Sequence, residues 1–288
     1  MAAATIPEER RLAIAAAIRR QPLVRAGELS ARFGVSVETV RRDLVALESQ
    51  GVLERVYGGA RGVPARTFEP PEHERRRREL PAKRAMASLV VSLLSPGNTV
   101  LLDVGTSVAE VARQLPWDFH GRVLTPSLPV AAALDSHEGV EVLVTGGQMR
   151  RGDMALSGRQ AERFLGDFYV DKAILGSGAV HPTAGLTDYY PAEVAARQII
   201  LKHAAETYVL ADATKLGHIA LCKVCDLQDV SAIVTDSRVT ERSLAELRES
   251  GATVLVARRG GGPGSARGAA LRGAGVVRTA AIEDHRLG

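Results

Sequence analysis

The chain has 288 residues, of which 45% are hydrophobic and 24% are charged, enough for about two globular domains with buried cores. No apolar run approaches the roughly 20 residues that span a bilayer. The first residues lack the basic-then-apolar pattern of a secretory signal. With only two cysteines, a disulfide framework is not expected, and a reducing cytoplasm is the predicted compartment. The net charge of +4 suits a polyanionic partner.

Helical periodicity dominates the first 62 residues, where apolar residues recur at helical spacing. The predicted helices cover residues 8–20, 27–33 and 36–49. Gly34 and Val35 form the turn between the second and third helices, and Ser36 is placed to cap the exposed N–H groups of the third. This arrangement predicts a helix-turn-helix.

The third predicted helix has one apolar and one polar side. The apolar side carries Val37, Val40, Leu44 and Leu47. The polar side carries Glu38, Thr39, Arg41, Arg42 and Ser49. A helix that lies in the major groove of DNA needs this division, and an arginine can bind guanine bidentately or hold a phosphate. Taken alone, an arginine pair on a helix is more often a solvated face of an ordinary helical bundle.

The segment after this helix favours DNA binding over the solvated bundle. Residues 51–61 contain two short β-like runs around glycines, which predicts a hairpin, or wing, from which arginine and tyrosine side chains could touch DNA. The predicted DNA-binding residues are Arg25, Ser36, Glu38, Thr39, Arg41, Arg42, Arg55, Tyr57 and Arg61.

The remainder of the chain divides by composition. Prolines and a charged run, 72–79, predict a linker over 63–81 in which the arginines form a solvated face or attract phosphates nonspecifically. An α/β domain is predicted over 82–257, beginning with a helix at 82–94. A Gly/Ala/Arg-rich flexible tail is predicted over 258–288, with a marginal strand at 275–281.

The α/β domain alternates short β-rich runs with helical stretches. The predicted strands are 99–104, 122–125, 140–145, 172–175, 208–211, 232–235 and 253–256. Predicted helices among them include 107–115, 192–205 and 241–250. Buried strands that alternate with helices predict a mainly parallel, helix-covered sheet.

Glycine and hydroxyl residues gather where these strands end. A glycine turn that enters a helix offers free backbone N–H groups to an anion, and ligands of parallel sheets collect at the strand ends. The predicted effector-binding residues are Asp103, Gly105, Thr106, Ser107, Thr125, Ser127, Gly146, Gly147, Gly176, Glu193, Asp212 and Lys215. Such turns are also common as purely structural features, and Glu193 fits equally well as an acid that favours a helix N-terminus.

Residues 29–44, continued by Leu47, Glu48, Gly51 and 57–60, resemble the signature of the DeoR family of bacterial regulators. The resemblance extends over about 69–256, through 103–107, 127–131, 146–147, 171–173, 185–187 and 212–217. It implies a winged helix-turn-helix followed by a sensor domain similar to ribose-5-phosphate isomerase. In that family Gly105, Thr106, Ser107 and Lys215 would correspond to phosphate-binding elements.

Three departures from the family and the related isomerases stand out. Many relatives have histidine at Tyr57, and relatives usually have asparagine at Pro126. Leu175 and Gly178 stand where the isomerases place carboxylates near the sugar, and neither can take a proton from carbon. The resemblance therefore implies a sensor without catalytic residues.

The leading hypothesis is a repressor of a carbohydrate catabolic operon, a homodimer or homotetramer that binds double-stranded operator DNA and is released by a phosphorylated sugar or sugar acid. The alternative is an isomerase-like sugar-phosphate enzyme that carries a DNA-binding domain. No cofactor is expected. Cys222 and Cys225 have knuckle-like spacing, but a zinc site needs a second ligand pair, so no metal is expected.

Overall fold

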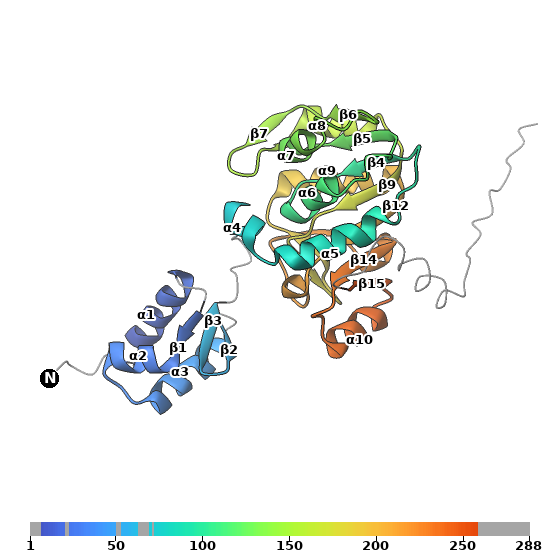
Figure 1. The fold of residues 1–288 in the computed structure, drawn as a ribbon. Helices are drawn as coiled ribbons and strands as arrows, with labels where there is room; N and C mark the ends of the chain where they lie inside the picture. The colour runs from blue at the N-terminus through green and yellow to red at the C-terminus, as the bar shows by residue number, and fades with distance from the viewer. Residues whose placement is uncertain (1–6, 21–22, 50–52, 63–68, 71, 259–288) are drawn as a thin grey trace, which may run out of the picture. The chain divides into compact units, whose positions relative to one another are not determined.

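The computed structural model describes residues 7–20, 23–49, 53–62, 69–70 and 72–258 (Figure 1). The chain divides into two compact units, Met1–Glu69 and Pro70–Gly288, which we call the head and the sensor unit. The predicted tail beyond Arg258, including the predicted strand at 275–281, lies outside the described residues.

The head combines three helices with a small antiparallel sheet. Its elements are α1 (Pro7–Arg20), β1 (Leu23–Arg25), α2 (Ala26–Phe33), α3 (Val37–Ser49), β2 (Leu53–Val56) and β3 (Gly59–Gly62). The predicted helices and hairpin are confirmed, and β1 adds an unpredicted third strand in the order β1-β3-β2. A Cβ on Gly59 would lie 2.1 Å from the carbonyl oxygen of Val24, so the close approach of β1 and β3 requires glycine there.

The core of the head forms where α3 packs on the other two helices. Its fully buried members include Ile14, Ile18, Leu29, Val40, Leu44, Leu47 and Leu53. The predicted apolar face of α3 is therefore confirmed from Val40 onward. Val37 is 39% exposed, because it lies in the first turn of α3, before the helix passes over the core.

A seven-stranded parallel sheet forms the centre of the sensor unit. Its strands are β4 (Thr99–Leu102), β5 (Gly121–Thr125), β6 (Val140–Val144), β9 (Val170–Leu175), β12 (Ala204–Leu210), β14 (Ala232–Asp236) and β15 (Val254–Ala257). They follow the order β15-β14-β12-β9-β4-β5-β6, and every neighbouring pair is parallel. The prediction of a mainly parallel sheet is confirmed.

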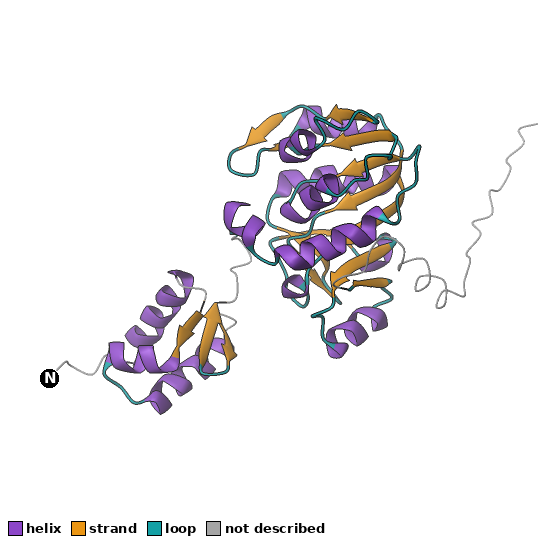
Figure 2. Ribbon diagram, viewed as in Figure 1, coloured by secondary structure: helices purple, strands orange, loops and turns teal. Residues whose placement is uncertain are grey.

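Helices cover both faces of this sheet (Figure 2). One face packs on α5 (Leu80–Val91), α6 (Thr106–Arg113) and α7 (Leu128–Ala133). The other packs on α8 (Arg159–Gly166), α9 (Pro191–His203) and α10 (Glu241–Glu249). Alternate residues of a strand point to opposite faces, so Val100 and Leu102 join the first core and Leu101 the second.

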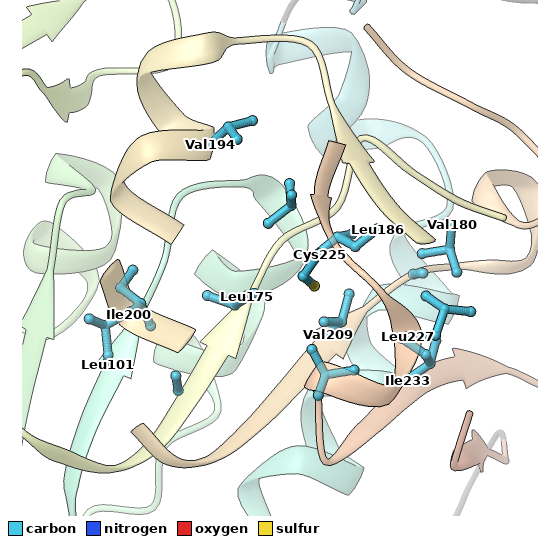
Figure 3. Packing of buried hydrophobic residues seen from close by; sticks show 14 of the residues in the cluster. Leu101, Leu175, Val180, Leu186, Val194, Ile200, Val209, Cys225, Leu227 and Ile233 are labelled. Atoms are coloured by element: carbon cyan, nitrogen blue, oxygen red, sulfur yellow. The ribbon is translucent and has the colours of Figure 1, made fainter. Parts of the chain in front are cut away.

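The sensor unit also contains short strands that the sequence did not predict. They are β7 (Gln148–Arg150), β8 (Ala155–Ser157), β10 (Ala179–His181), β11 (Gly185–Asp188) and β13 (Cys222–Cys225). Strands β10, β11 and β13 form an antiparallel sheet. Its residues Val180, Leu186 and Cys225 pack with Leu175 and Ile200 of the main sheet and α9 (Figure 3).

The predicted linker is wrong for residues 72–81. There the structure has helix α4 (Glu72–Arg77) and the start of α5, and the division between the two units falls between Glu69 and Pro70. The arginine run looked like a solvated face, but Arg75 makes a largely buried ion pair with Asp153. A pairing partner 78 residues away leaves no local pattern in the sequence.

Candidate functional site

Helix α3 presents its polar side on the surface of the head. Ser36 Oγ accepts a hydrogen bond from the backbone N–H of Thr39 at 3.1 Å, so the predicted cap is confirmed. Arg42 is exposed and makes no ion pair with any residue that the structure describes. Arg41 lies 3.5 Å from Glu38, with both side chains more than 60% exposed. Such a pair is weak and leaves Arg41 able to bind another anion.

The residue after these arginines points the opposite way. Asp43 is buried and pairs with Arg10 at 2.6 Å and with Arg11 at 3.0 Å. Both arginines belong to α1, so this carboxylate fixes the rotation of α3 against α1 while Arg41 and Arg42 stay outside. The sequence analysis missed this pair, because a single aspartate on a helix carries no signal of a partner 32 or 33 residues away.

The arginines of the wing are already paired within the head. Arg55 Nε lies 2.6 Å from a Glu48 carboxylate oxygen, and Arg61 Nη2 lies 2.6 Å from Glu54. Tyr57, at the turn between β2 and β3, is fully exposed. Arg25, just before α2, is also exposed. These four predicted residues therefore lie at the surface, but a phosphate would have to compete with glutamate for Arg55 and Arg61.

Apart from Glu193, which lies in the first turn of α9, the predicted effector-binding residues of the sensor unit lie at or just after the ends of five adjacent strands. In the sheet order these strands are β12, β9, β4, β5 and β6. Since parallel strands end at the same edge of a sheet, Asp212 and Lys215 lie next to Gly176, which lies next to the turn at Gly105. Thr125 and Gly146 come further along the same edge.

The turn after β4 has the geometry expected of an anion-binding turn. Gly105 precedes α6 with φ of +119°, a conformation that favours glycine. No side chain caps this helix, so its first N–H groups remain available to a ligand. Thr106 and Ser107 follow in the first turn and are both buried.

A buried ion network lies beside this turn and was not predicted. Asp103 accepts from the backbone N–H of Gly176 at 3.1 Å and from Arg197 Nε at 2.7 Å. Arg197 also pairs with Asp188. Burial by itself disfavours the charged guanidinium, but Asp103, Asp188 and Glu193 outweigh it and raise the pKa of Arg197. Burial also works against the Asp188 carboxylate, yet Arg197 holds the pKa of Asp188 below its ordinary value.

Glu193 links that network to β7. Its carboxylate lies 2.6 Å from Arg150 and 3.7 Å from Arg197. Burial nevertheless raises the pKa of Glu193 to about 7. The Arg150 guanidinium also contacts Asp153 at 2.7 Å and stacks over the Tyr190 ring at 3.4 Å. Nε and Nη1 of Arg150 are buried and have no acceptor within the described part of the chain.

Lys215 follows the end of β12, and Lys83 of α5 interacts with it electrostatically. Lys215 donates to the carbonyl oxygen of Ser177, and Asp212 accepts from the backbone N–H of Thr214 at 3.0 Å. Lys83 of α5, which was not predicted, is buried. Burial lowers the pKa of Lys83 to about 8, while Asp212 acts to raise it and Lys215 to lower it. Negative and positive groups from two elements thus meet at this strand end.

The remaining predicted effector residues have structural roles. Thr125 Oγ1 accepts from the N–H of Ser127 at 3.0 Å, and Ser127 Oγ caps α7. A Cβ on Gly147 would lie 2.5 Å from the Ser157 carbonyl oxygen, and one on Gly176 would lie 2.6 Å from that of Val104. Close backbone approach therefore accounts for these two glycines without a ligand, and Gly146 has a positive φ of 69°.

Leu175 and Gly178, which stand where the isomerases have carboxylates, lie beside the buried ion network of Arg197. Leu175 is fully buried in the core that Figure 3 draws. A Cβ on Gly178 would lie 2.9 Å from Cα of Asp188, so a larger residue does not fit there.

Cys225 is buried, and burial raises the pKa of its thiol to about 12. Among the described residues, no group of three potential ligands could hold a metal ion.

Comparison with known proteins adds to this geometry. A family model for the DeoR-like helix-turn-helix domain matches residues 10–64, and one for the DeoR C-terminal sensor domain matches residues 78–237. The HTH-type transcriptional regulator GlpR of Haloferax volcanii is 34% identical over 227 residues, which are 79% of this chain and 89% of that protein. The lactose phosphotransferase system repressor of Staphylococcus epidermidis is 31% identical over 228 residues, 78% and 90% of the respective chains.

A solved structure of ribose 5-phosphate isomerase A from Methanocaldococcus jannaschii aligns with a TM-score of 0.34 and 19% identity, over 46% of this chain and 52% of that one. No helix among the described residues is long and apolar enough to cross a membrane.

A winged helix-turn-helix with an exposed arginine helix, joined to a parallel α/β unit, defines a DNA-binding transcriptional regulator rather than an enzyme. The chain belongs to the DeoR family.

Proposed function

We propose that this chain represses a carbohydrate catabolic operon and leaves its operator when a phosphorylated sugar or sugar acid binds at the strand ends of the sensor unit. For the DNA part, the observation that carries the proposal is the orientation of α3. Asp43 pairs with Arg10 and Arg11 on the buried side of the helix. Arg41 and Arg42 remain exposed on the other side. An arginine that reaches a guanine edge contributes about 1–3 kcal/mol of discrimination.

The effector part rests on the unused hydrogen-bond donors at one edge of the sheet. The uncapped start of α6 and the two buried donors of Arg150 are suited to an anion. The carboxylates of Glu193 and Asp212 are suited to sugar hydroxyls. The S. epidermidis relative is named as the repressor of a lactose phosphotransferase system, which agrees with an effector of this class.

We further propose a homodimer or homotetramer. One small head makes few base contacts, and symmetric oligomers gain affinity from repeated half-sites. An effector can drive release only to the extent that it binds the DNA-free arrangement more tightly.

The DNA assignment is tested with duplexes that the purified chain selects from a random library. Arg42→Ala is expected to weaken binding of the selected duplex roughly fivefold to a hundredfold in a gel-shift titration. The matched control is Arg242→Ala, which removes an 88% exposed arginine of the sensor unit that pairs with Glu246. Wild-type affinity for Arg42→Ala, with an unchanged circular dichroism spectrum, would contradict the assignment.

The effector assignment is tested by thermal-shift screening with phosphorylated sugars and sugar acids. A compound that stabilises the wild type should release the selected duplex. Lys215→Ala should lose most of that stabilisation and release, and should keep its DNA affinity. Lys223→Ala, which removes an exposed lysine paired with Asp226, should respond as the wild type does. A normal response of Lys215→Ala would remove this lysine from the pocket.

A further inference from the structure

Helix α4 is the first helix of the sensor unit after the segment that joins it to the head. It has only six residues. An isolated helix of that length is unstable in water, because nucleation costs more than so few hydrogen bonds return. The helical state of α4 therefore depends on contacts with the body of the sensor unit.

Two contacts supply that support. Arg75 Nη2 lies 2.6 Å from Asp153 Oδ2, and both side chains are largely buried. Lys83 Nζ of α5 donates to the carbonyl oxygens of Arg75 and, at 2.8 Å, of Arg78, close to the C-terminal end of α4 where carbonyl groups lack partners. Of the other arginines, Arg76 and Arg78 pair within the segment with Glu72 and Glu74, and Arg77 is exposed. Arg75 is thus the side chain of the run that anchors α4 to the rest of the unit.

Asp153 and Lys83, which hold α4 in place, both also interact with groups at the strand ends. Asp153 also binds Arg150, whose Nη2 contacts Glu193 at 2.6 Å. Glu193 in turn neighbours Arg197, which binds Asp103 directly before the Gly105 turn. An unbroken series of ion pairs therefore runs from that turn to α4.

Lys83, which makes the second contact with α4, interacts with charged groups at the same edge of the sheet. Asp212 and Lys215, which follow β12, both act electrostatically on Lys83 and oppose each other in setting its pKa. Lys83 is therefore close enough to this strand end to be attracted by an anion bound there.

We propose that α4 is the output element of the sensor unit: an anionic effector at the strand ends draws Arg150 from Asp153 and Lys83 from the carbonyl groups of α4, and so loosens the helix next to the connection between the two units. The inference rests on the proposed function, because it requires an anion at that edge.

Loosening α4 adds its six residues to the connection with the head. In an oligomer, a longer connection lowers the effective concentration of one head at its half-site once the other is bound. Ordering the residues of α4 again when both heads bind DNA costs conformational entropy. The effector can thus weaken operator binding without contacting the head.

The anchors are tested by hydrogen exchange on the full chain without ligand. Arg75→Gln and Asp153→Asn should each speed exchange of the Arg78 amide, which donates to the Glu74 carbonyl oxygen, roughly tenfold to a hundredfold. The double variant should exchange no faster than the faster single one, because both changes break the same pair. Arg76→Gln, one residue along the same helix, should change the rate less than threefold. Equal effects of Arg75→Gln and Arg76→Gln would overturn the inference.

The coupling is tested with inorganic phosphate as the probe. Saturating phosphate should raise the thermal midpoint of the wild-type chain and speed exchange of the Arg78 amide at least fivefold. In Asp153→Asn, where α4 is already loose, phosphate should still raise the midpoint and should change that rate less than twofold. A phosphate-induced thermal shift with unchanged α4 exchange would overturn the inference and leave the proposed function intact. A wild-type chain that phosphate does not stabilise would contradict the anion pocket itself, and with it both proposals.

Discussion

Replacing Arg197 by methionine tests how the buried ion network stabilises the sensor unit. The guanidinium and its two carboxylate partners, Asp103 and Asp188, are each no more than 5% exposed as side chains. Methionine fills much of the volume but leaves both carboxylates buried without a counter-charge. The change should therefore destabilise the fold even though it adds apolar surface.

The magnitude follows from the cost of an uncompensated buried charge. Removing one partner of a buried pair costs about 3–5 kcal/mol, a large part of the roughly 5–15 kcal/mol that stabilises a typical domain. For a unit of this size, each kcal/mol lowers the melting temperature by about 2–4 °C. We expect Arg197→Met to melt roughly 6–20 °C below the wild type.

The single tryptophan gives a direct assay of the right unit. Trp117 lies in the sensor unit, where its ring stacks on His137, so its fluorescence during denaturant unfolding reports on this unit alone. Arg242→Met, at an exposed surface pair, should cost less than about 1 kcal/mol. Adding Asp103→Asn and Asp188→Asn to Arg197→Met should recover most of the loss, because no buried charge then lacks a partner. An Arg197→Met chain within 1 kcal/mol of the wild type would refute the reasoning.

Three further predictions concern single side chains. Burial raises the pKa of Glu193 from 4.5 to about 7. The free energy of unfolding should therefore fall by roughly 3 kcal/mol as the pH rises from 4.5 through 7. Glu193→Gln should abolish this fall when denaturant titrations are compared at the two pH values. Asp43→Ala removes the buried carboxylate that pairs with Arg10 and Arg11 and should destabilise the head by about 3–5 kcal/mol, seen as an early circular dichroism transition with unchanged Trp117 fluorescence. Ser36→Ala removes the cap of α3 and should cost about 0.5–2 kcal/mol in the same transition.

Local patterns in the sequence were sufficient for the helices and hairpin of the head and for the central sheet of the sensor unit. The apolar spacing in 36–49 gives a helix with one buried side, and glycines at 58 and 59 give the turn of the wing. Apolar strand runs separated by helical stretches give a parallel sheet, because consecutive parallel strands need a crossover helix. The candidate strand-end residues followed from the same rule, since ligand sites of such sheets lie at the strand ends.

The charged groups between elements could not be predicted in the same way. Arg197 and Gln198 interrupt an apolar stretch of α9, which is a weak sign of burial, but the partners of Arg197, Asp103 and Asp188, come from β-strand ends 94 and 9 residues away. Arg75 looked like a solvated charge of a linker, and no sequence pattern singled out Lys83. Whether a charge is solvated or buried depends on which distant element faces it, and that is fixed only when the chain is folded.

The sequence by itself therefore determined the three helices and hairpin of the head, the parallel sheet and the surface helix that carries Arg41 and Arg42, because these depend on residues a few positions apart. Only the tertiary structure decided that Asp43 faces inward, that Thr125 and Ser127 serve their own turn, and that α4 belongs to the sensor unit. Electrostatic and hydrogen-bond partners are chosen by proximity in space, and a buried charge is stable only where the fold brings its counter-charge.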